Sequence, residues 1–194
     1  HLMLVHFTSA DTLAHRTGPL SVRHRAALEV YDALVGQLMQ ALRDVGRESE
    51  TTVIVVSDHG FLKIKQGLDA KRLLLDAGFA SADVSVADNG HLAYVYLRGG
   101  EGREERAERA KAVFWGHPAV ERVVDSRDFQ ALGLPRPSSN PTIGDVLIVS
   151  RPEWAFTKLS GRRTTGPYKY KATHGYFPEH PDNHPVFIAS GPGI

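Results

Sequence analysis

The chain has 194 residues, a formal net charge of +1 and no cysteine. The near-neutral charge argues against nucleic acid or an anionic membrane as the main partner, and the absence of cysteine excludes disulfide bonds and thiolate metal ligands. No apolar run reaches the ~20 residues that span a bilayer, and the length suits one sizeable core, so we expect a single domain over residues 1–194.

The first part of the chain predicts a strand, a helix and a second strand. Residues 2–7 form an apolar run that is typical of a strand covered on both faces. Ser21 then begins a long pattern of apolar residues at three- and four-residue steps, with Ser21 as the N-cap and Gly46 as the residue beyond the helix end. Residues 51–57 are a β-branched strand. This order of elements predicts a right-handed parallel crossover.

The rest of the chain mixes short strands with short helices. An insertion or cap is expected within residues 66–143, where the Pro/Ser-rich loop at 135–141 suits neither a helix nor a central strand. We predict a brief extended segment at residues 62–65, strands at 91–98, 120–124, 145–149 and 186–189, helices at 68–77 and 101–115, and a helical turn at 128–132. The fold class is therefore α/β, with a mostly parallel sheet flanked by helices.

Five residues that can bind metals follow the predicted strands. Asp11 and His15 come after the run at residues 2–7, Asp58 and His59 follow the strand at 51–57, and His174 precedes the last strand. In open α/β sheets, ligands and catalytic groups gather at the carboxyl ends of strands. We expect the three segments to converge there and to hold metal ions.

The types of these side chains narrow the choice of metal. Imidazole nitrogen combined with carboxylate oxygen suits Zn²⁺ better than the all-oxygen shells preferred by Ca²⁺ and Mg²⁺, with Mn²⁺ or Fe as competitors. A turn would let Asp11 and His15 face one ion, and Asp58 and His59 can do the same from an irregular loop.

Two further features near these residues allow alternative interpretations. The basic stretch at residues 157–173, which includes Tyr168 and Tyr170, either attracts a phosphate and stacks on a base or is a solvated surface loop. Phe61 either stacks on a substrate base or packs beneath the metal ligands. The sequence favours the simpler interpretation in each case.

Three segments together resemble a known family. ADTLAHRTGP, VVSDHGF and THGYFPEHPDNHPVFIASGPGI are similar to the later metal-binding motifs of the type I phosphodiesterase/nucleotide pyrophosphatase family, within the alkaline phosphatase superfamily, and they occur in the same order. The resemblance covers most of the chain, although residues 66–143 carry no diagnostic motif. It implies an alkaline-phosphatase-like sheet that is incomplete at its N-terminal side.

The resemblance also implies a role for each of the five residues. One zinc would be bound by Asp11, His15 and His174, and the second by Asp58 and His59 with an Asp from an earlier segment. The Thr or Ser nucleophile of the family has no match in this chain, so we expect it upstream and assign no catalytic residue here. This chain would then be the C-terminal portion of a two-zinc hydrolase of phosphodiester or pyrophosphate bonds, inactive alone and holding at most one tightly bound metal ion.

Other functions and partners follow from the same residues. The resemblance allows a phosphomonoesterase or, less readily, a sulfatase, because a sulfatase favours a hard cation with oxygen ligands. A non-catalytic metal-binding module is the alternative from another class. The expected partner is a small phosphate ester of the nucleotide type. An incomplete sheet would also leave apolar surface uncovered, which favours self-association or pairing with the N-terminal part.

Overall fold

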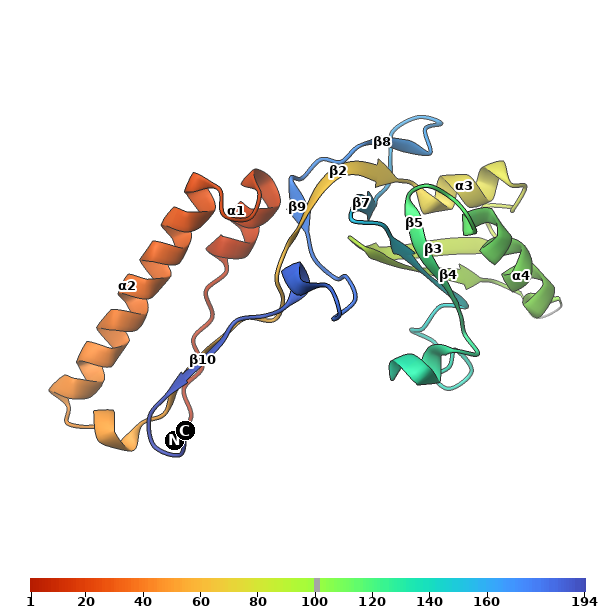
Figure 1. The fold of residues 1–194 in the computed structure, drawn as a ribbon. Helices are drawn as coiled ribbons and strands as arrows, with labels where there is room; N and C mark the ends of the chain where they lie inside the picture. Colours follow the sequence, from red (N-terminus) through yellow and green to blue (C-terminus); the bar gives the residue numbers. More distant parts are fainter. Residues whose placement is uncertain (100–101) are drawn as a thin grey trace. The chain divides into compact units, whose positions relative to one another are not determined.

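The computed structural model describes residues 1–99 and 102–194 (Figure 1). These residues form two compact units. The first unit consists of His1–Lys63, Tyr170–Thr173 and Phe177–Ile194, and the second of Ile64–Lys169 and His174–Tyr176. Whether the chain is one domain with a cap or insertion within residues 66–143 stays a prediction.

The first unit is built on two helices. Helix α1 covers Ser9–Thr17 and helix α2 covers Val22–Asp44, followed by the 3₁₀ turn η1 at Glu48–Glu50. The expected cap of α2 is confirmed, because Ser21 Oγ accepts a hydrogen bond from the backbone N–H of His24. The helix ends as predicted, with Gly46 just beyond it at φ 67°.

The predicted strand at residues 2–7 is wrong for the structure described. The segment has no strand pairing and is exposed, with Leu2 at 85% and Leu4 at 86% of full accessibility. Strand β1 (Val53–Val56) pairs instead with β10 (Phe187–Ser190), in antiparallel orientation. A strand gains its stability from ladder hydrogen bonds and burial, and residues 2–7 have neither, so the parallel crossover is not formed.

Strand β2 (Leu62–Leu68) is the longest strand and is paired along its length by three short ones. It runs parallel to β7 (Glu153–Phe156) and antiparallel to β8 (Thr165–Pro167) and β9 (Ala172–Thr173). The pairing with β9 uses Leu62 and Lys63, within the first unit. The extended segment expected at residues 62–65 is therefore confirmed and is longer than predicted.

The second unit contains an antiparallel sheet and most of the buried apolar residues. The strand order is β3 (Val84–Asn89), β4 (Leu92–Leu97), β6 (Val146–Ser150) and β5 (Val120–Asp125). Helices α3 (Ala70–Asp76) and α4 (Arg103–Phe114) pack against it. The core includes the fully buried side chains of Leu74, Phe114, Ile148 and Phe156.

Most of the elements expected after residue 60 are present. In β4, Ala93, Val95 and Leu97 are buried while their neighbours are half-buried, as the alternation predicts. The short 3₁₀ turns are η2 at Phe129–Leu132, where a helical turn was expected, and η3 at Pro181–Asn183. The helix expected at 101–115 is α4, although residue 101 itself lies outside the described residues.

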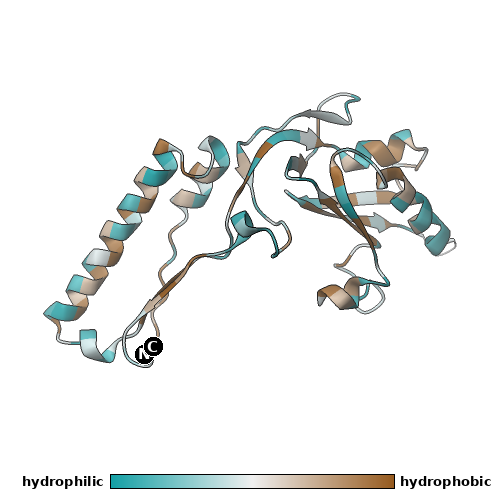
Figure 2. Cartoon of the chain, viewed as in Figure 1, coloured by the Kyte–Doolittle hydropathy of each residue, from teal (hydrophilic) through white to brown (hydrophobic). Residues whose placement is uncertain are grey.

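The mixed α/β class is confirmed, but the strand directions differ from the expectation. Among the pairings of the described strands, only β2 with β7 is parallel. The other pairs are antiparallel because β3 and β4 form a hairpin and β6 returns beside β4. Figure 2 shows hydrophobic residues along β1 and β10 as well as in the strands of the second unit. Among the described residues, no helix is long and apolar enough to cross a membrane.

Candidate metal site

Helix α1 carries the first two candidate ligands. Asp11 and His15 lie at i and i+4, so they share one face of the helix, and Asp11 Oδ1 is 3.6 Å from His15 Nε2. The sequence predicted a turn here, whereas the structure has a regular helix. The helix also places Asp11 and His15 on the same side. The side chains are 47% and 21% exposed, respectively, so both can be reached by a ligand from solution.

The short strand β9 holds the C-terminal end of α1. His15 Nδ1 lies 2.9 Å from the carbonyl oxygen of Ala172, and the N–H of Lys171 donates to the carbonyl oxygen of His15 at 2.8 Å. His174 directly follows Thr173, the last residue of β9. Asp11, His15 and His174 are all half-buried.

His15 and His59 of the first unit each have a tautomer in which Nε2 can bind a metal. A carbonyl oxygen can only accept, so Nδ1 of His15 must be the donor in its contact with Ala172. His59 repeats this pattern, with Nδ1 3.0 Å from the carbonyl oxygen of Gly60 and Nε2 3.6 Å from Asp58 Oδ2. The lone pair is then on Nε2, on the side of the carboxylate, as in metal-bound histidines that are oriented by a backbone carbonyl.

Phe61 links the two pairs of candidate ligands. Its ring centroid is 5.0 Å from that of His15 and 5.3 Å from that of His59, and both contacts are edge-on. Tyr170 lies on another part of the His15 ring, at 5.4 Å. These contacts favour the packing interpretation of Phe61 and bring the segment at residues 58–61 next to α1. Asp58 itself is 86% exposed.

Two glycines shape the segments that carry the histidines. A Cβ atom on Gly60 would lie 2.1 Å from the carbonyl oxygen of Asp182, so this position needs a residue without a side chain. The N–H of Gly60 also donates to the carbonyl oxygen of Asn183 at 2.9 Å. Gly175 has φ +81°, and a Cβ there would meet the carbonyl oxygen of Asn89 at 2.8 Å. Neither glycine was singled out from the sequence, although each directly follows a candidate histidine ligand.

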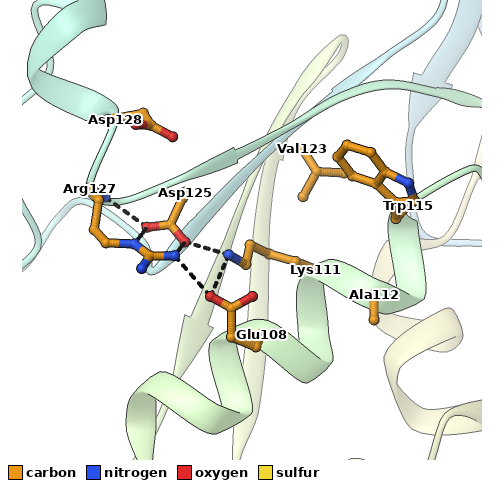
Figure 3. A pocket seen from close by; sticks show the side chains of 8 residues that line it. All are labelled: Glu108, Lys111, Ala112, Trp115, Val123, Asp125, Arg127 and Asp128. Carbon is orange, nitrogen blue, oxygen red and sulfur yellow. Dashed lines mark hydrogen bonds and ion pairs between the residues drawn. The ribbon is translucent and has the colours of Figure 1, made fainter.

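A shallow hollow of about 410 Å³ on the second unit is unrelated to these residues. Figure 3 shows that its lining is an ion-pair network in which Asp125 binds Arg127 and Lys111, and Glu108 contacts both cations. The hydrogen bond from Arg127, and then that from Lys111, hold the pKa of Asp125 well below its usual range, although burial acts in the opposite direction. The charges are paired with one another, so the network stabilises α4 against β5.

The donor set of Asp11, His15 and His174 fits a zinc ion. One carboxylate oxygen and two imidazole nitrogens can supply three ligands of a tetrahedral site and leave the fourth position to water or substrate. The paired Nδ1 atom of His15 and the shared helix face of Asp11 and His15 agree with such a site.

Comparison with known proteins identifies relatives along most of the chain. The family model of type I phosphodiesterase/nucleotide pyrophosphatase matches residues 1–177. An uncharacterised pyrophosphatase/phosphodiesterase of Schizosaccharomyces pombe is 22% identical over 193 residues, which are 98% of this chain and 39% of that protein. Mouse ectonucleotide pyrophosphatase/phosphodiesterase family member 1 is 34% identical over 76 residues, covering 39% of this chain and 8% of the relative.

Solved structures of the same kind share the fold. Human ectonucleotide pyrophosphatase/phosphodiesterase 5 superposes with a TM-score of 0.73 at 19% identity, over 94% of this chain and 45% of the human chain. An inactive variant of the murine protein, in complex with AMP, gives a TM-score of 0.72 at 20% identity, with the same coverage of 94% and 45%.

The chain thus spans less than half the length of these relatives. The family model, in turn, matches nearly all residues of this chain. Its mixed α/β fold is that of the ectonucleotide pyrophosphatase/phosphodiesterase 5 structures on which it superposes. The chain therefore belongs to the type I phosphodiesterase/nucleotide pyrophosphatase family.

Proposed function

We propose that the protein to which this chain belongs hydrolyses phosphodiester or pyrophosphate bonds of nucleotide-type substrates at a zinc site. Asp11, His15 and His174 would hold one ion, and Asp58 and His59 would contribute to a second. The observation that carries the proposal is the Asp11–His15 pair on one face of α1, with Nε2 of His15 on the side of the Asp11 carboxylate and Nδ1 held by Ala172, in a chain of this family. The names of the relatives and the AMP complex of the murine protein support a nucleotide-type substrate.

The surroundings of the ligands suit this chemistry. A bound zinc ion would polarise a phosphoryl oxygen and offset the charge that grows in the transition state. The carbonyl oxygen of Ala172 fixes the imidazole of His15 in one orientation, so that Nε2 is available without rearrangement. The rings of Phe61 and Tyr170 cover parts of His15 and reduce the access of water to it.

We expect the nucleophile, a Thr or Ser, to come from a segment outside residues 1–194, because no motif among these residues resembles the one that carries it in the family. Residues 1–194 would then bind metal without turning over substrate. We expect the purified chain to retain at most one tightly bound metal ion, since Asp58 and His59 alone make an incomplete site.

A zinc titration of the purified chain tests the metal site. Replacing His15 by Ala removes one of the proposed ligands, and we expect the affinity for Zn²⁺ to fall by more than the roughly 10- to 100-fold that loss of a ligand-orienting residue costs. His6→Ala is the matched control, because His6 is exposed in the same unit and lies outside the donor group. Competition with a chromophoric chelator measures the affinity. Equal affinities of the His15→Ala and unsubstituted chains, or two zinc equivalents kept after dialysis, would contradict the proposed site.

Turnover by the full-length gene product tests the reaction. We expect hydrolysis of a p-nitrophenyl nucleotide diester to exceed that of p-nitrophenyl phosphate and p-nitrophenyl sulfate, and Asp11→Asn to lower it strongly. A preference for p-nitrophenyl phosphate would replace the diesterase by a phosphomonoesterase. Comparable turnover by residues 1–194 alone would show that the nucleophile lies within them.

A further inference from the structure

The first turn of α1 has no capping side chain of its own. Thr8 occupies the N-cap position but makes no side-chain hydrogen bond to the helix. An N-cap side chain normally accepts from the N–H of the second or third helical residue, and here the second residue is Ala10. The first turn therefore needs an acceptor from elsewhere in the chain.

Tyr31 of α2 supplies this acceptor. Its hydroxyl oxygen accepts from the N–H of Ala10 at 2.7 Å and forms a second hydrogen bond with Ser9 Oγ at 2.8 Å. Its ring stacks on Phe7, with centroids 4.8 Å apart and planes inclined by 24°. Because the ring is held by stacking and the hydroxyl by two polar contacts, the phenol gives the start of α1 a fixed position.

The residue after Ala10 is Asp11, the carboxylate of the candidate metal site. The far end of α1 is fixed separately, since His15 is bonded to Ala172 and Lys171 through its ring and its carbonyl group. Tyr31 thus fixes the end of the helix that carries the oxygen ligand, and β9 fixes the end that carries the nitrogen ligand.

We propose that Tyr31 is a positioning residue for metal binding, and that its hydroxyl holds Asp11 in reach of the ion bound by His15. This inference rests on the proposed metal site. Without the hydroxyl, the N–H of Ala10 loses its acceptor, the first turn frays, and Asp11 spends less time in the geometry that coordinates the ion. Tyr31 itself does not touch the ion.

The test compares zinc affinity in three single variants and one double variant of the chain. Tyr31→Phe keeps the stacking on Phe7 and removes only the hydroxyl. Tyr96→Phe is the matched control, because it also removes a hydroxyl that is hydrogen-bonded to the backbone, here as donor to the carbonyl oxygen of Thr142 in the second unit. Thr8→Asn adds a strong N-cap side chain next to Ala10, alone and together with Tyr31→Phe.

We expect Tyr31→Phe to weaken zinc binding by about tenfold, in line with other residues that orient ligands. We expect Tyr96→Phe and Thr8→Asn alone to bind as the unsubstituted chain does. The double variant should recover most of the lost affinity, because asparagine replaces the missing acceptor. The absorption spectrum of bound Co²⁺ should change in Tyr31→Phe and return in the double variant, whereas a general loss of stability would leave the spectrum of the bound ion unchanged.

Two results would overturn the inference: unchanged zinc affinity in Tyr31→Phe, or a loss that Thr8→Asn fails to restore. If Tyr31→Phe alone folds poorly, the double variant decides the question, because the inference requires it to recover zinc binding. His15→Ala in the same assay separates this inference from the proposed function. If His15→Ala binds zinc normally, the metal site itself is wrong, whereas if only Tyr31→Phe binds normally, the site stands and the role of Tyr31 falls.

Discussion

His15 and His59 each donate an Nδ1 proton to a backbone carbonyl group, and each has Nε2 beside a carboxylate. The two histidines come from different kinds of structure, a helix and an irregular loop, yet they reach the same tautomer. Local backbone geometry decides this in both cases, because the accepting carbonyl groups belong to Ala172 and to Gly60. The tautomer and the orientation of these two imidazole rings therefore depend on the backbone as much as on the side chains.

Gly60 gives a direct test of this dependence. Gly60→Ala would place a Cβ atom 2.1 Å from the carbonyl oxygen of Asp182, so the loop at residues 58–61 or the turn η3 must move. We expect a loss of about 1–3 kcal/mol in the free energy of unfolding, the usual cost of overpacking. Urea denaturation followed by circular dichroism measures it.

Gly36→Ala is the control for this change. Gly36 lies inside α2, where a Cβ would have no atom within 4 Å, so we expect about 0.5–1 kcal/mol of stabilisation from the better helix former. If Gly60→Ala behaved like Gly36→Ala, the close approach of Asp182 to Gly60 would be incorrect.

At the scale of elements, salt bridges connect α4 to the strands of the second unit. Lys111 of α4 binds Asp125 at the end of β5, and Arg127 binds the same carboxylate at 2.9 Å. At the N-terminal end of α4, Arg103 binds Asp145, whose second oxygen accepts from the N–H of Leu97. A helix with many charges is thereby attached to an antiparallel sheet by polar contacts as well as by Phe114.

The salt bridges of Asp125 predict that the stability of the folded chain depends on pH. The folded pKa of Asp125 is depressed, so its contribution is present above the unfolded value of 3.8 and is lost as the pH falls toward the folded pKa. We expect Asp125→Asn to cost about 1–2 kcal/mol at neutral pH, because much of Arg127 is solvated. The difference between the two proteins should shrink below the unfolded value.

Asp128→Asn is the control, since Asp128 is exposed and lines the same hollow. We expect it to leave the unfolding free energy nearly unchanged across the same pH range. A difference between Asp125→Asn and the unsubstituted chain that stayed constant down to strongly acidic pH would contradict the depressed pKa.

The sequence predicted those elements whose pattern is local. Helix α2 has apolar residues at helical spacing, a serine N-cap and Gly46 after its end, and β4 has a clear alternation, so both were identified. Helix α1 was expected only as a turn, and its nine residues include Ser9, Thr12 and Thr17, which are weak helix formers. Its stability comes from Tyr31 and β9, and neither contact can be read from a window of sequence.

Strand pairing was predicted less well for the same physical reason. The apolar run at residues 2–7 looks like a strand, but a strand also needs a neighbour, and among the described residues β1 is paired by β10 instead. Strands β8 and β9 have three and two residues, and they exist because β2, about a hundred residues earlier, offers free hydrogen-bonding groups. The ligands of the candidate site were predictable because their chemistry is visible, whereas the supporting contacts of Phe61 and Gly60 depend on the fold.

At the scale of the whole molecule, the chain buries its apolar residues unevenly. The core cluster lies in the second unit, whereas the first unit exposes Val56 at 64%, Phe187 at 67% and Leu4 at 86%. Val56 and Phe187 are partners in the β1–β10 register, so they add to the same exposed surface. Such a surface favours contact with another protein segment.

We predict that the purified chain of residues 1–194 self-associates through this surface. Sedimentation velocity over a range of concentrations should show species heavier than one chain. Val56→Lys should shift the distribution toward the monomer, because a charge on the strand pair opposes association. Val45→Lys is the control, as Val45 is 68% exposed just beyond α2. A monomer at every concentration would contradict the prediction.

The contact between Gly60 and the turn η3 has a consequence for shortened forms of the protein. A premature stop codon after Phe177 would delete both β10 and the carbonyl groups that bracket Gly60. The truncated product would keep Asp11, His15 and His174 but release the loop that carries Asp58 and His59. The carboxyl-terminal tail thus holds the loop of Asp58 and His59 in place. A protease cut in the tail would release these two candidate ligands and leave Asp11 and His15 in position.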